Sequence, residues 1–548
     1  MTDTSTLLRI DGLTVDYRAG ARRWRNAITD LDLHVDRGEL VSLVGESGSG
    51  KTTAVHAALG LLPPEARIRS GSVVYSDVEV TGWNHQRMSL VRGNHVGFIP
   101  QDPNTSLNPV KKIGRQVVEA VRFNERQPAG GSRRVEFALE SLRTAGLPDP
   151  DRVFGQYPHE LSGGMKQRVL IAIALAGRPE IILADEPTSA LDVTVQKAIL
   201  DHLQRLRDEL GIGILLVTHD LGVALDRSDR VLVMRHGEIV ESGPVDAVVD
   251  DTADDYTRTL LDAAPNRHRQ RLAPTTGPAT EPSGEVVIEA RGLTKSYRLR
   301  SERGELRALD AADLRVREGT THAIVGESGA GKSTFAGILA GFTVPDGGEV
   351  LAGERSLVGL RGRRLREARR DLQFVFQNPY TSLDPRFTVQ RIIAEPLRAF
   401  GLVSGREERT ERVLELLRSV GLDESHLNRR PSQLSGGQRQ RVAIARALAP
   451  TPRVLVLDEA VSALDVSAQA QILQLLVDLQ ARSGLSYVFV THDLGVVRLI
   501  AHDVTVLKDG SVLETGSVDE VFGTPRHDYT RQLLAAIPGD RLAIADAR

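Results

Sequence analysis

The sequence of 548 residues contains no cysteine. This absence excludes disulfides, thiolate zinc sites and cysteine-bound iron–sulfur clusters, and it fits a reducing compartment. The sequence also lacks an excess of basic charge, because 69 Lys and Arg residues stand against 72 Asp and Glu residues, for a formal net charge of −3. Without a global basic field of the kind that drives nucleic-acid binding, no nucleic-acid partner is expected.

Long apolar runs are missing as well. No stretch approaches the roughly 18–20 apolar residues that a membrane-spanning helix needs, and residues 1–5 lack the pattern of a signal peptide. We therefore expect a protein of the cytosolic side that reaches a membrane only through partner chains. The chain is too long for one core, since domains typically hold about 100–200 residues.

A phosphate-binding loop occurs twice. Residues 45–52 (GESGSGKT) and 326–333 (GESGAGKS) both match the Walker A pattern, and each follows a short apolar run. The glycines let successive backbone N–H groups point into one concavity, the lysine reaches the outer phosphates, and the Thr or Ser hydroxyl faces Mg²⁺. Only a bound nucleoside triphosphate uses all of these groups together, so the sequence predicts two nucleotide sites.

The predicted nucleotide-binding residues of the two loops occupy equivalent positions. They are Gly45, Ser47, Gly48, Gly50, Lys51, Thr52 and Thr53 in the first copy, and Gly326, Ser328, Gly329, Gly331, Lys332, Ser333 and Thr334 in the second. Leu7 to Tyr17 alternates apolar and polar residues, which predicts an edge strand. Tyr17 and its counterpart Tyr297 either pack in the ordinary way or stack on an adenine ring.

Polar residues follow two further predicted strands in each copy. Gln101 and Gln377 come directly after apolar runs, where an amide either caps the strand or reaches Mg²⁺ and the attacking water. Asp185 and Glu186, and likewise Asp458 and Glu459, end runs of four apolar residues at the edge where α/β sheets bind ligands. The Asp is predicted to hold Mg²⁺ through water, and the Glu to polarise the hydrolytic water.

Two more motifs also allow a purely structural interpretation. A Ser-Gly-Gly triplet opens a predicted helix in each copy, either as a second anion cradle or as a plain N-cap. Its residues are Ser162, Gly163 and Gly164 in the first copy, and Ser435, Gly436 and Gly437 in the second. His219 and His492 each end a predicted strand, where a lone histidine is usually structural.

The spacing of these motifs indicates a duplicated domain. From Ser162 to Glu186 is 24 positions, as it is from Ser435 to Glu459, and each Glu precedes its histidine by 33 positions. We predict a first domain over 1–264, a Pro-rich tether over 265–285 and a second domain over 286–548. Helical spacing over 111–160 and 386–433 predicts a mostly α-helical subdomain in each half.

With these motifs in this order, twice, the sequence resembles the nucleotide-binding domains of ABC transporters. The resemblance implies an α/β fold of two tandem domains, each a P-loop RecA-like core with an antiparallel β edge and an α-helical subdomain. It implies ATP and Mg²⁺ as ligands, catalytic roles for Glu186 and Glu459 with their histidines and glutamines, and Ser-Gly-Gly contacts to ATP. The variants of these motifs, and a tail repeated at 255–261 and 528–534, resemble the dipeptide, oligopeptide and nickel importer branch.

The resemblance also implies partners and a mechanism. The chain is expected at the cytoplasmic face of the plasma membrane, as a peripheral ATPase that powers an importer of di- or oligopeptides, with nickel or another small solute as the alternative. Two transmembrane permease subunits and an extracytoplasmic substrate-binding protein are expected. The single chain forms a pseudodimer in which Lys51 faces Ser435 and Lys332 faces Ser162.

Other members of the same superfamily remain alternatives at this stage. A soluble tandem ABC translation factor also lacks membrane spans, but such proteins tend to join their halves by a long charged helical arm, whereas this joint is rich in proline. A DNA-repair ABC ATPase would carry cysteine zinc sites, which this sequence lacks. An exporter subunit is a further alternative.

Overall fold

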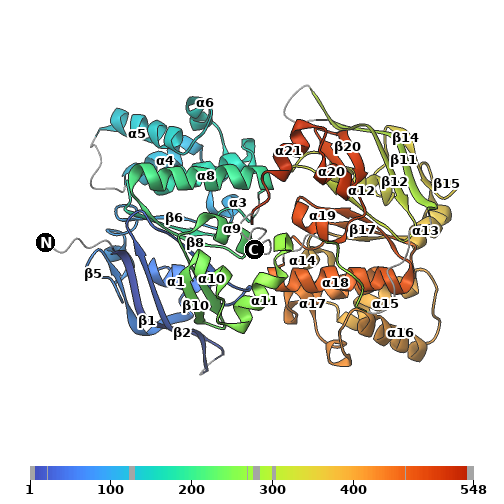
Figure 1. The fold of residues 1–548 in the computed structure, drawn as a ribbon, viewed down its shortest axis with the longest axis horizontal. Coiled ribbons are helices and arrows are strands. Elements are labelled where there is room, and N and C mark those ends of the chain that lie inside the picture. The colour runs from blue at the N-terminus through green and yellow to red at the C-terminus, as the bar shows by residue number, and fades with distance from the viewer. Residues whose placement is uncertain are drawn as a thin grey trace. The chain divides into compact units, whose positions relative to one another are not determined.

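The computed structural model describes residues 6–20, 23–122, 130–189, 191–267, 270–275, 284–298, 304–462 and 464–539. The chain divides into two compact units, Met1–Arg267 with Pro538–Arg548, and His268–Ile537. The division after Arg267 falls inside the segment that the sequence predicts to be a Pro-rich joint. Figure 1 colours residues 1–267 from blue to green and the second unit onward to red.

The first unit begins with an antiparallel sheet in the strand order β2-β1-β4-β5. Its strands are β1 (Thr6–Arg18), β2 (Trp24–Asp36), β4 (Ala66–Tyr75) and β5 (Val78–Glu79). The prediction of an edge strand at Leu7–Tyr17 is wrong, because β1 pairs with β2 on one side and with β4 on the other. Alternation marks a strand with one buried face, and it carries no information on how many neighbours that strand has.

A six-stranded sheet in the order β10-β9-β3-β8-β7-β6 forms the centre of the first unit. Its strands are β3 (Leu40–Val44), β6 (Val96–Ile99), β7 (Ile181–Asp185), β8 (Gly213–Val217), β9 (Arg230–Arg235) and β10 (Glu238–Pro244). All neighbours are parallel except β10 and β9. Every residue of β3, β7 and β8 is buried, as expected for parallel strands that are covered on both faces.

The helices of the first unit connect and cover these strands (Figure 1). They are α1 (Lys51–Ala58), α2 (His85–Met88), α3 (Pro103–Ser106), α4 (Ile113–Arg122), α5 (Gly131–Thr144), α6 (Pro150–Gly155), α7 (Gly163–Leu175), α8 (Val193–Leu210), α9 (Leu221–Arg227), α10 (Val245–Asp250) and α11 (Asp255–Ala263). The prediction of a helical subdomain over 111–160 is confirmed by α4, α5 and α6. Val117 and Val121 of α4 and Leu142 of α5 lie in one core cluster with residues of α7.

The second unit repeats this architecture. Its antiparallel sheet has the order β12-β11-β14-β15, and its main sheet the order β16-β17-β18-β13-β19-β20. The strands are β11 (Val286–Arg298), β12 (Glu305–Arg317), β13 (Thr321–Val325), β14 (Gly347–Ala352), β15 (Arg355–Ser356), β16 (Leu372–Val375), β17 (Val454–Asp458), β18 (Ser486–Val490), β19 (Asp503–Lys508) and β20 (Ser511–Ser517).

The helices of the second unit occur in a similar order along the chain. They are α12 (Lys332–Leu339), α13 (Gly362–Asp371), α14 (Pro379–Ser382), α15 (Val389–Ala399), α16 (Arg406–Ser419), α17 (Gly436–Leu448), α18 (Val466–Ser483), α19 (Leu494–Ile500), α20 (Val518–Gly523) and α21 (Asp528–Leu534). α15 and α16 form the helical subdomain predicted over 386–433. None of the helices in the described ranges is both long enough and apolar enough to cross a membrane.

Part of the predicted tether is bound to the second unit. Leu272 N donates to the carbonyl oxygen of Leu499 at 2.8 Å. Thr275 donates to the carboxylate of Asp478 from its backbone N at 2.8 Å and from its hydroxyl at 2.9 Å. The described residues of this segment, 270–275, therefore lie along α18 and the end of α19, while 276–283 fall outside the described residues.

Candidate functional site

The nucleotide loop of each unit connects a central strand to the next helix. Gly45, the first residue after β3, has a φ of 149°, and a Cβ at this position would lie 2.1 Å from the carbonyl oxygen of Met234 in β9. Gly326 repeats this with a φ of 153° and a distance of 2.1 Å to the carbonyl oxygen of Leu507. Only glycine fits here, so the loop can lie directly against the neighbouring strand.

Each loop folds around the ammonium group of its own lysine. Lys51 Nζ donates to the carbonyl oxygens of Gly45 and Glu46, both at 2.8 Å, although the residue is only 5% exposed. In the second unit Lys332 Nζ makes the two corresponding bonds at 2.8 and 2.9 Å. A charge removed from water needs such partners. The loop thus holds a positive charge beside a helix N-terminus, which is an arrangement suited to phosphate.

A hydroxyl and a carboxylate meet next to each lysine. Thr52 Oγ1 donates to Asp185 Oδ1 at 3.2 Å, and Ser333 Oγ donates to Asp458 Oδ1 at 3.3 Å. Burial raises the pKa of Asp185 more than the hydrogen bond from Thr52 lowers it, and the neighbouring charge of Glu186 adds to the rise. A nearby cation would relieve this unfavourable burial of charge.

This donor set fits Mg²⁺. The ion is usually held by one or two protein carboxylates or hydroxyls, with water and substrate phosphates completing its shell. Within the described ranges no three His, Asp or Glu side chains come together to hold a metal on their own. The hydroxyl–carboxylate pair is therefore suited to a magnesium ion that arrives with a nucleotide.

Glu186 and Glu459 stand in a strained backbone position. Their φ angles are 45° and 47°, in the left-handed region that residues other than glycine rarely adopt. Glu186 N donates to the carbonyl oxygen of Val217 at 2.9 Å, and Glu459 N donates to that of Val490 at 2.9 Å. These bonds to carbonyl oxygens of the adjacent parallel strand hold the strained residue in place, and such strain is common at functional sites.

The carboxylate of each strained glutamate is bound by the predicted glutamine and histidine. Gln101 Nε2 donates to Glu186 Oε2 at 2.7 Å, and His219 Nδ1 lies 3.2 Å from the same oxygen. In the second unit Gln377 Nε2 donates to Glu459 Oε2 at 2.8 Å, and the Nδ1 atom of its histidine, His492, lies 3.5 Å from Oε1. The structure therefore brings together three residues that lie far apart in each half of the sequence.

Burial and pairing shift the pKa values of these groups in opposite directions. Burial would lower the pKa of His219, but the hydrogen bond and charge of Glu186 outweigh it and raise the pKa above its usual value. Burial would raise the pKa of Glu186, but the hydrogen bond and charge of His219, with smaller contributions from Lys51 and Gln101, outweigh it and lower the pKa. His492 and Glu459 shift in the same directions for the same reasons. The glutamate is thus held as a carboxylate, the form that accepts a proton.

The Ser-Gly-Gly triplets open α7 and α17. Ser162 Oγ accepts a hydrogen bond from Met165 N at 3.3 Å, and Ser435 Oγ accepts one from Gln438 N at 3.3 Å. The N-cap interpretation is therefore confirmed, whereas the anion cradle stays a prediction. A Cβ on Gly164 would lie 2.5 Å from a methyl carbon of Val195 in α8, so the glycine also permits close helix packing.

The two predicted adenine-stacking tyrosines have different surroundings. Tyr17 is half-buried, and its hydroxyl lies 3.5 Å from Thr53 Oγ1 at the start of α1. Tyr297 is 42% exposed, and Lys295 Nζ lies 5.6 Å from the centre of its ring. The contact with Thr53 places the first tyrosine beside the nucleotide loop, while stacking on a base stays a prediction for both.

Sequence reasoning overlooked one pair of residues at the loops. Tyr256 in α11 and Tyr529 in α21 each accept a hydrogen bond on the hydroxyl oxygen, from Glu46 N and Glu327 N, both at 3.1 Å. The signal that could have identified them is the tail repeated at 255–261 and 528–534. Their sequence separation from the loops, about 200 residues, hides this contact.

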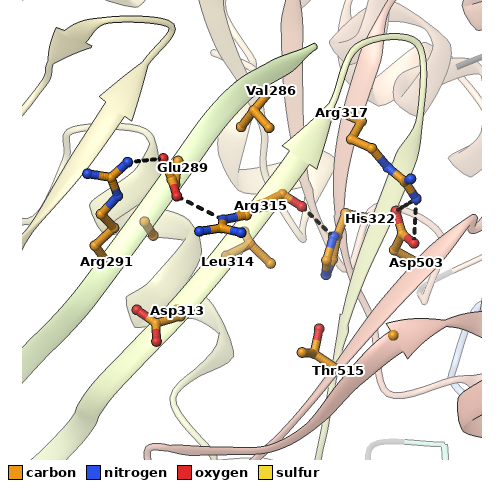
Figure 2. Close-up of a pocket in the computed structure, with 12 residues that line it drawn as sticks. Val286, Glu289, Arg291, Asp313, Leu314, Arg315, Arg317, His322, Asp503 and Thr515 are labelled. Atoms are coloured by element: carbon orange, nitrogen blue, oxygen red, sulfur yellow. Dashed lines mark hydrogen bonds and ion pairs between the residues drawn. The ribbon is translucent and has the colours of Figure 1, made fainter. Parts of the chain in front are cut away.

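A separate cavity of about 650 Å³ lies at the other end of the parallel strands in the second unit (Figure 2). Its charged side chains are already engaged: Glu289 binds Arg291 and Arg315, Asp503 binds Arg317, and Asp313 accepts from Gly292 N. Burial lowers the pKa of His322 to about 4, so this residue is neutral at neutral pH. The residues that line the cavity belong to β11, β12, β13, β19 and β20 and do not include the nucleotide loop, so we assign it no part in the site.

Comparisons with known proteins agree with this geometry. The family model described as "ABC transporter" matches residues 28–189 and 309–462, and the model described as "Oligopeptide/dipeptide transporter, C-terminal region" matches 240–285 and 513–542. The chain is 41% identical to the oligopeptide transport ATP-binding protein OppD of Mycobacterium tuberculosis, over 97% of this chain and 98% of that protein. It is 40% identical to the glutathione import ATP-binding protein GsiA of Escherichia coli, over 98% of this chain and 90% of that protein. A solved structure of a dimeric ATP-binding cassette with bound ADP and phosphate is 32% identical, covers 44% of this chain and 99% of its own, and has a TM-score of 0.40.

We expect Glu186→Gln and Glu459→Gln each to abolish hydrolysis at one site while ATP affinity is kept. The amide retains the shape of the side chain but cannot accept a proton, and general-base catalysis typically contributes about 10²–10⁴-fold. The measurement is ATP binding and steady-state ATPase for each single variant. Glu180→Gln, at the opposite end of β7, is the matched control. Unchanged turnover in either single variant would show that its site does not hydrolyse ATP.

The paired histidines give a pH prediction. Glu186 raises the pKa of His219 above 6.5. The pairing of the two side chains therefore stabilises the folded chain below pH 6.5, and this stabilisation is lost as the pH rises through the raised pKa of His219. Glu186→Gln should leave burial as the main influence and lower the pKa of His219. The measurement is a histidine NMR titration, with the signal assigned from its loss in His219→Asn. An unchanged pKa in Glu186→Gln would contradict the pairing.

Proposed function

The chain belongs to the ABC transporter family as an ATPase with two ATP-binding domains, and from this premise we propose that it powers an importer of di- or oligopeptides. The observation that carries the proposal is the match of both tails, 240–285 and 513–542, to the C-terminal region of oligopeptide and dipeptide transporters. Nickel or another small solute is the alternative cargo. The relatives named for oligopeptide transport and for glutathione import favour short peptides.

We assign the catalytic roles in the same way to both units. Lys51 and Lys332 bind the outer phosphates, and the adjacent Thr52 and Ser333, with Asp185 and Asp458, hold Mg²⁺, which supplies neutralisation of phosphate charge when bound. The carboxylate of Glu186 or Glu459 accepts a proton from the attacking water. Gln101 and His219, or Gln377 and His492, orient that carboxylate, which supports full catalytic competence of both sites.

The matched family models and the relatives named for import support the choice of partners. We propose that it sits peripherally at the cytoplasmic face of the plasma membrane, bound to two permease subunits, with a substrate-binding protein on the other side. Each ATP is shared by the loop of one unit and the Ser-Gly-Gly triplet of the other, so Lys51 faces Ser435 and Lys332 faces Ser162. ATP closure and hydrolysis then move the permeases between two states.

Stimulation of the ATPase tests this proposal. We expect the isolated chain to hydrolyse ATP slowly, and to hydrolyse it faster in proteoliposomes that contain its co-purified permeases and a loaded binding protein. Uptake of labelled dipeptides and oligopeptides should depend on ATP, with glutathione and Ni²⁺ as competing cargoes. The double variant Glu186→Gln/Glu459→Gln is the control for coupling. Strong stimulation by ribosomes and none by permeases would favour a translation factor instead.

A further inference from the structure

We propose that Tyr256 and Tyr529 are positioning residues for ATP binding, which orient the phosphate-binding lysine through a single peptide group. The two tyrosines lie in the tails matched by the oligopeptide/dipeptide transporter model, outside the ABC transporter model itself. The proposal depends on ATP binding at the two loops and is independent of the transported solute.

The geometry of one peptide group carries the argument. Glu46 N donates to the hydroxyl oxygen of Tyr256 at 3.1 Å, and Gly45 O accepts from Lys51 Nζ at 2.8 Å. That N–H and that C=O belong to the same peptide group, which is planar and trans, so they point in opposite directions. Holding the N–H in place therefore also holds the carbonyl that binds the lysine.

The second unit contains the same arrangement. Glu327 N donates to the hydroxyl oxygen of Tyr529 at 3.1 Å, and Gly326 O accepts from Lys332 Nζ at 2.8 Å. Because both peptide groups follow a glycine, their rotation is limited less by side chains than that of most peptide groups. An external hydrogen bond is thus a suitable way to fix them.

The tyrosines themselves are firmly held. Tyr256 is 7% exposed and Tyr529 3% exposed, and a cation lies over each ring: the guanidinium carbon of Arg235 at 4.6 Å and Lys508 Nζ at 4.5 Å from the ring centres. Tyr256 also shares a core cluster with Val44, the last residue of the strand before the loop. A hydroxyl on so rigid a ring is a well-placed partner for the loop.

Helices α11 and α21 begin with different N-caps, yet their tyrosines make the same contact. In the first unit Asp254 Oδ1 accepts from Tyr256 N at 2.9 Å, whereas in the second His527 Nδ1 accepts from Tyr529 N at 3.1 Å. Two different N-caps therefore lead to the same hydroxyl position at the nucleotide loop. This favours a role for the hydroxyl beyond the packing of the ring.

The test removes only the two hydroxyl oxygens from the full-length chain. We expect Tyr256→Phe/Tyr529→Phe to bind ATP about three- to tenfold more weakly, the effect of one hydrogen bond per site. KM for ATP should rise by a similar factor with kcat nearly unchanged, because the lysine binds phosphate in both the ground state and the transition state. The single variants assign the loss to each site.

Two other buried tyrosines provide the matched control. Tyr75 donates to the carbonyl oxygen of Ala58 at 3.1 Å, and Tyr487 donates to that of Leu476 at 2.9 Å, so Tyr75→Phe/Tyr487→Phe also removes two buried hydroxyl bonds. We expect this variant to lose thermal stability but to keep the wild-type ATP affinity. The melting temperature of both double variants is measured alongside.

The possible results distinguish a failure of the positioning role from a failure of the ATPase assignment. Wild-type ATP affinity in Tyr256→Phe/Tyr529→Phe, with a melting temperature lowered as in the control variant, would overturn the positioning role and leave the ATPase assignment intact. Equal loss of affinity in the control variant would also overturn it. Absence of ATP binding by the wild-type chain would overturn both the nucleotide sites and this inference.

Discussion

Each nucleotide site depends on a buried ammonium group that the loop backbone surrounds. Lys51 is 5% exposed, its ammonium group donates to the carbonyl oxygens of Gly45 and Glu46, and its charge helps to lower the pKa of Glu186. This is possible only because Gly45 brings the loop directly against β9 and because the next turn is also fixed, with Gly237 N donating to the carbonyl oxygen of Ser49 at 2.9 Å. The loop thus presents a positive charge beside a helix N-terminus, which is an arrangement suited to phosphate.

The carboxylates to which we assign Mg²⁺ binding and proton acceptance lie at the same sheet edge. Parallel strands end side by side, so Asp185 and Glu186 after β7, and His219 after β8, reach a common edge with the loop after β3. The strained φ of Glu186 is held by the hydrogen bond that its backbone N donates to the neighbouring strand. Burial raises the pKa of Asp185, whereas hydrogen bonds and nearby cations lower the pKa of Glu186 and keep it a carboxylate. Both units repeat these features, which supports the proposal that the two sites are equally competent.

Local patterns were enough to predict which residues meet at this sheet edge, because these residues follow short apolar runs, which the structure folds as buried strands. This holds for the loops, the Asp-Glu pairs, the glutamines and the histidines. The edge-strand prediction failed since the pairing of β1 with β4 is a long-range contact that alternation does not encode. The binding of Thr275 to Asp478 is invisible in a Pro- and Thr-rich composition, and the hydroxyl of Tyr256 reaches a loop about 200 residues earlier.

We propose that one chain supplies both halves of each ATP site. Because the natural sequence has no cysteine, Ser47→Cys with Ser435→Cys creates a clean pair, and a disulfide requires Cα atoms within about 7 Å. The measurement is the mass of the oxidised product when ATP is trapped by Glu186→Gln/Glu459→Gln, with Ser47→Cys/Ser162→Cys as the control. We expect an ATP-dependent intrachain bond for the first pair and none for the control. Covalent dimers of twice the chain mass would contradict it, because two chains would then share each site.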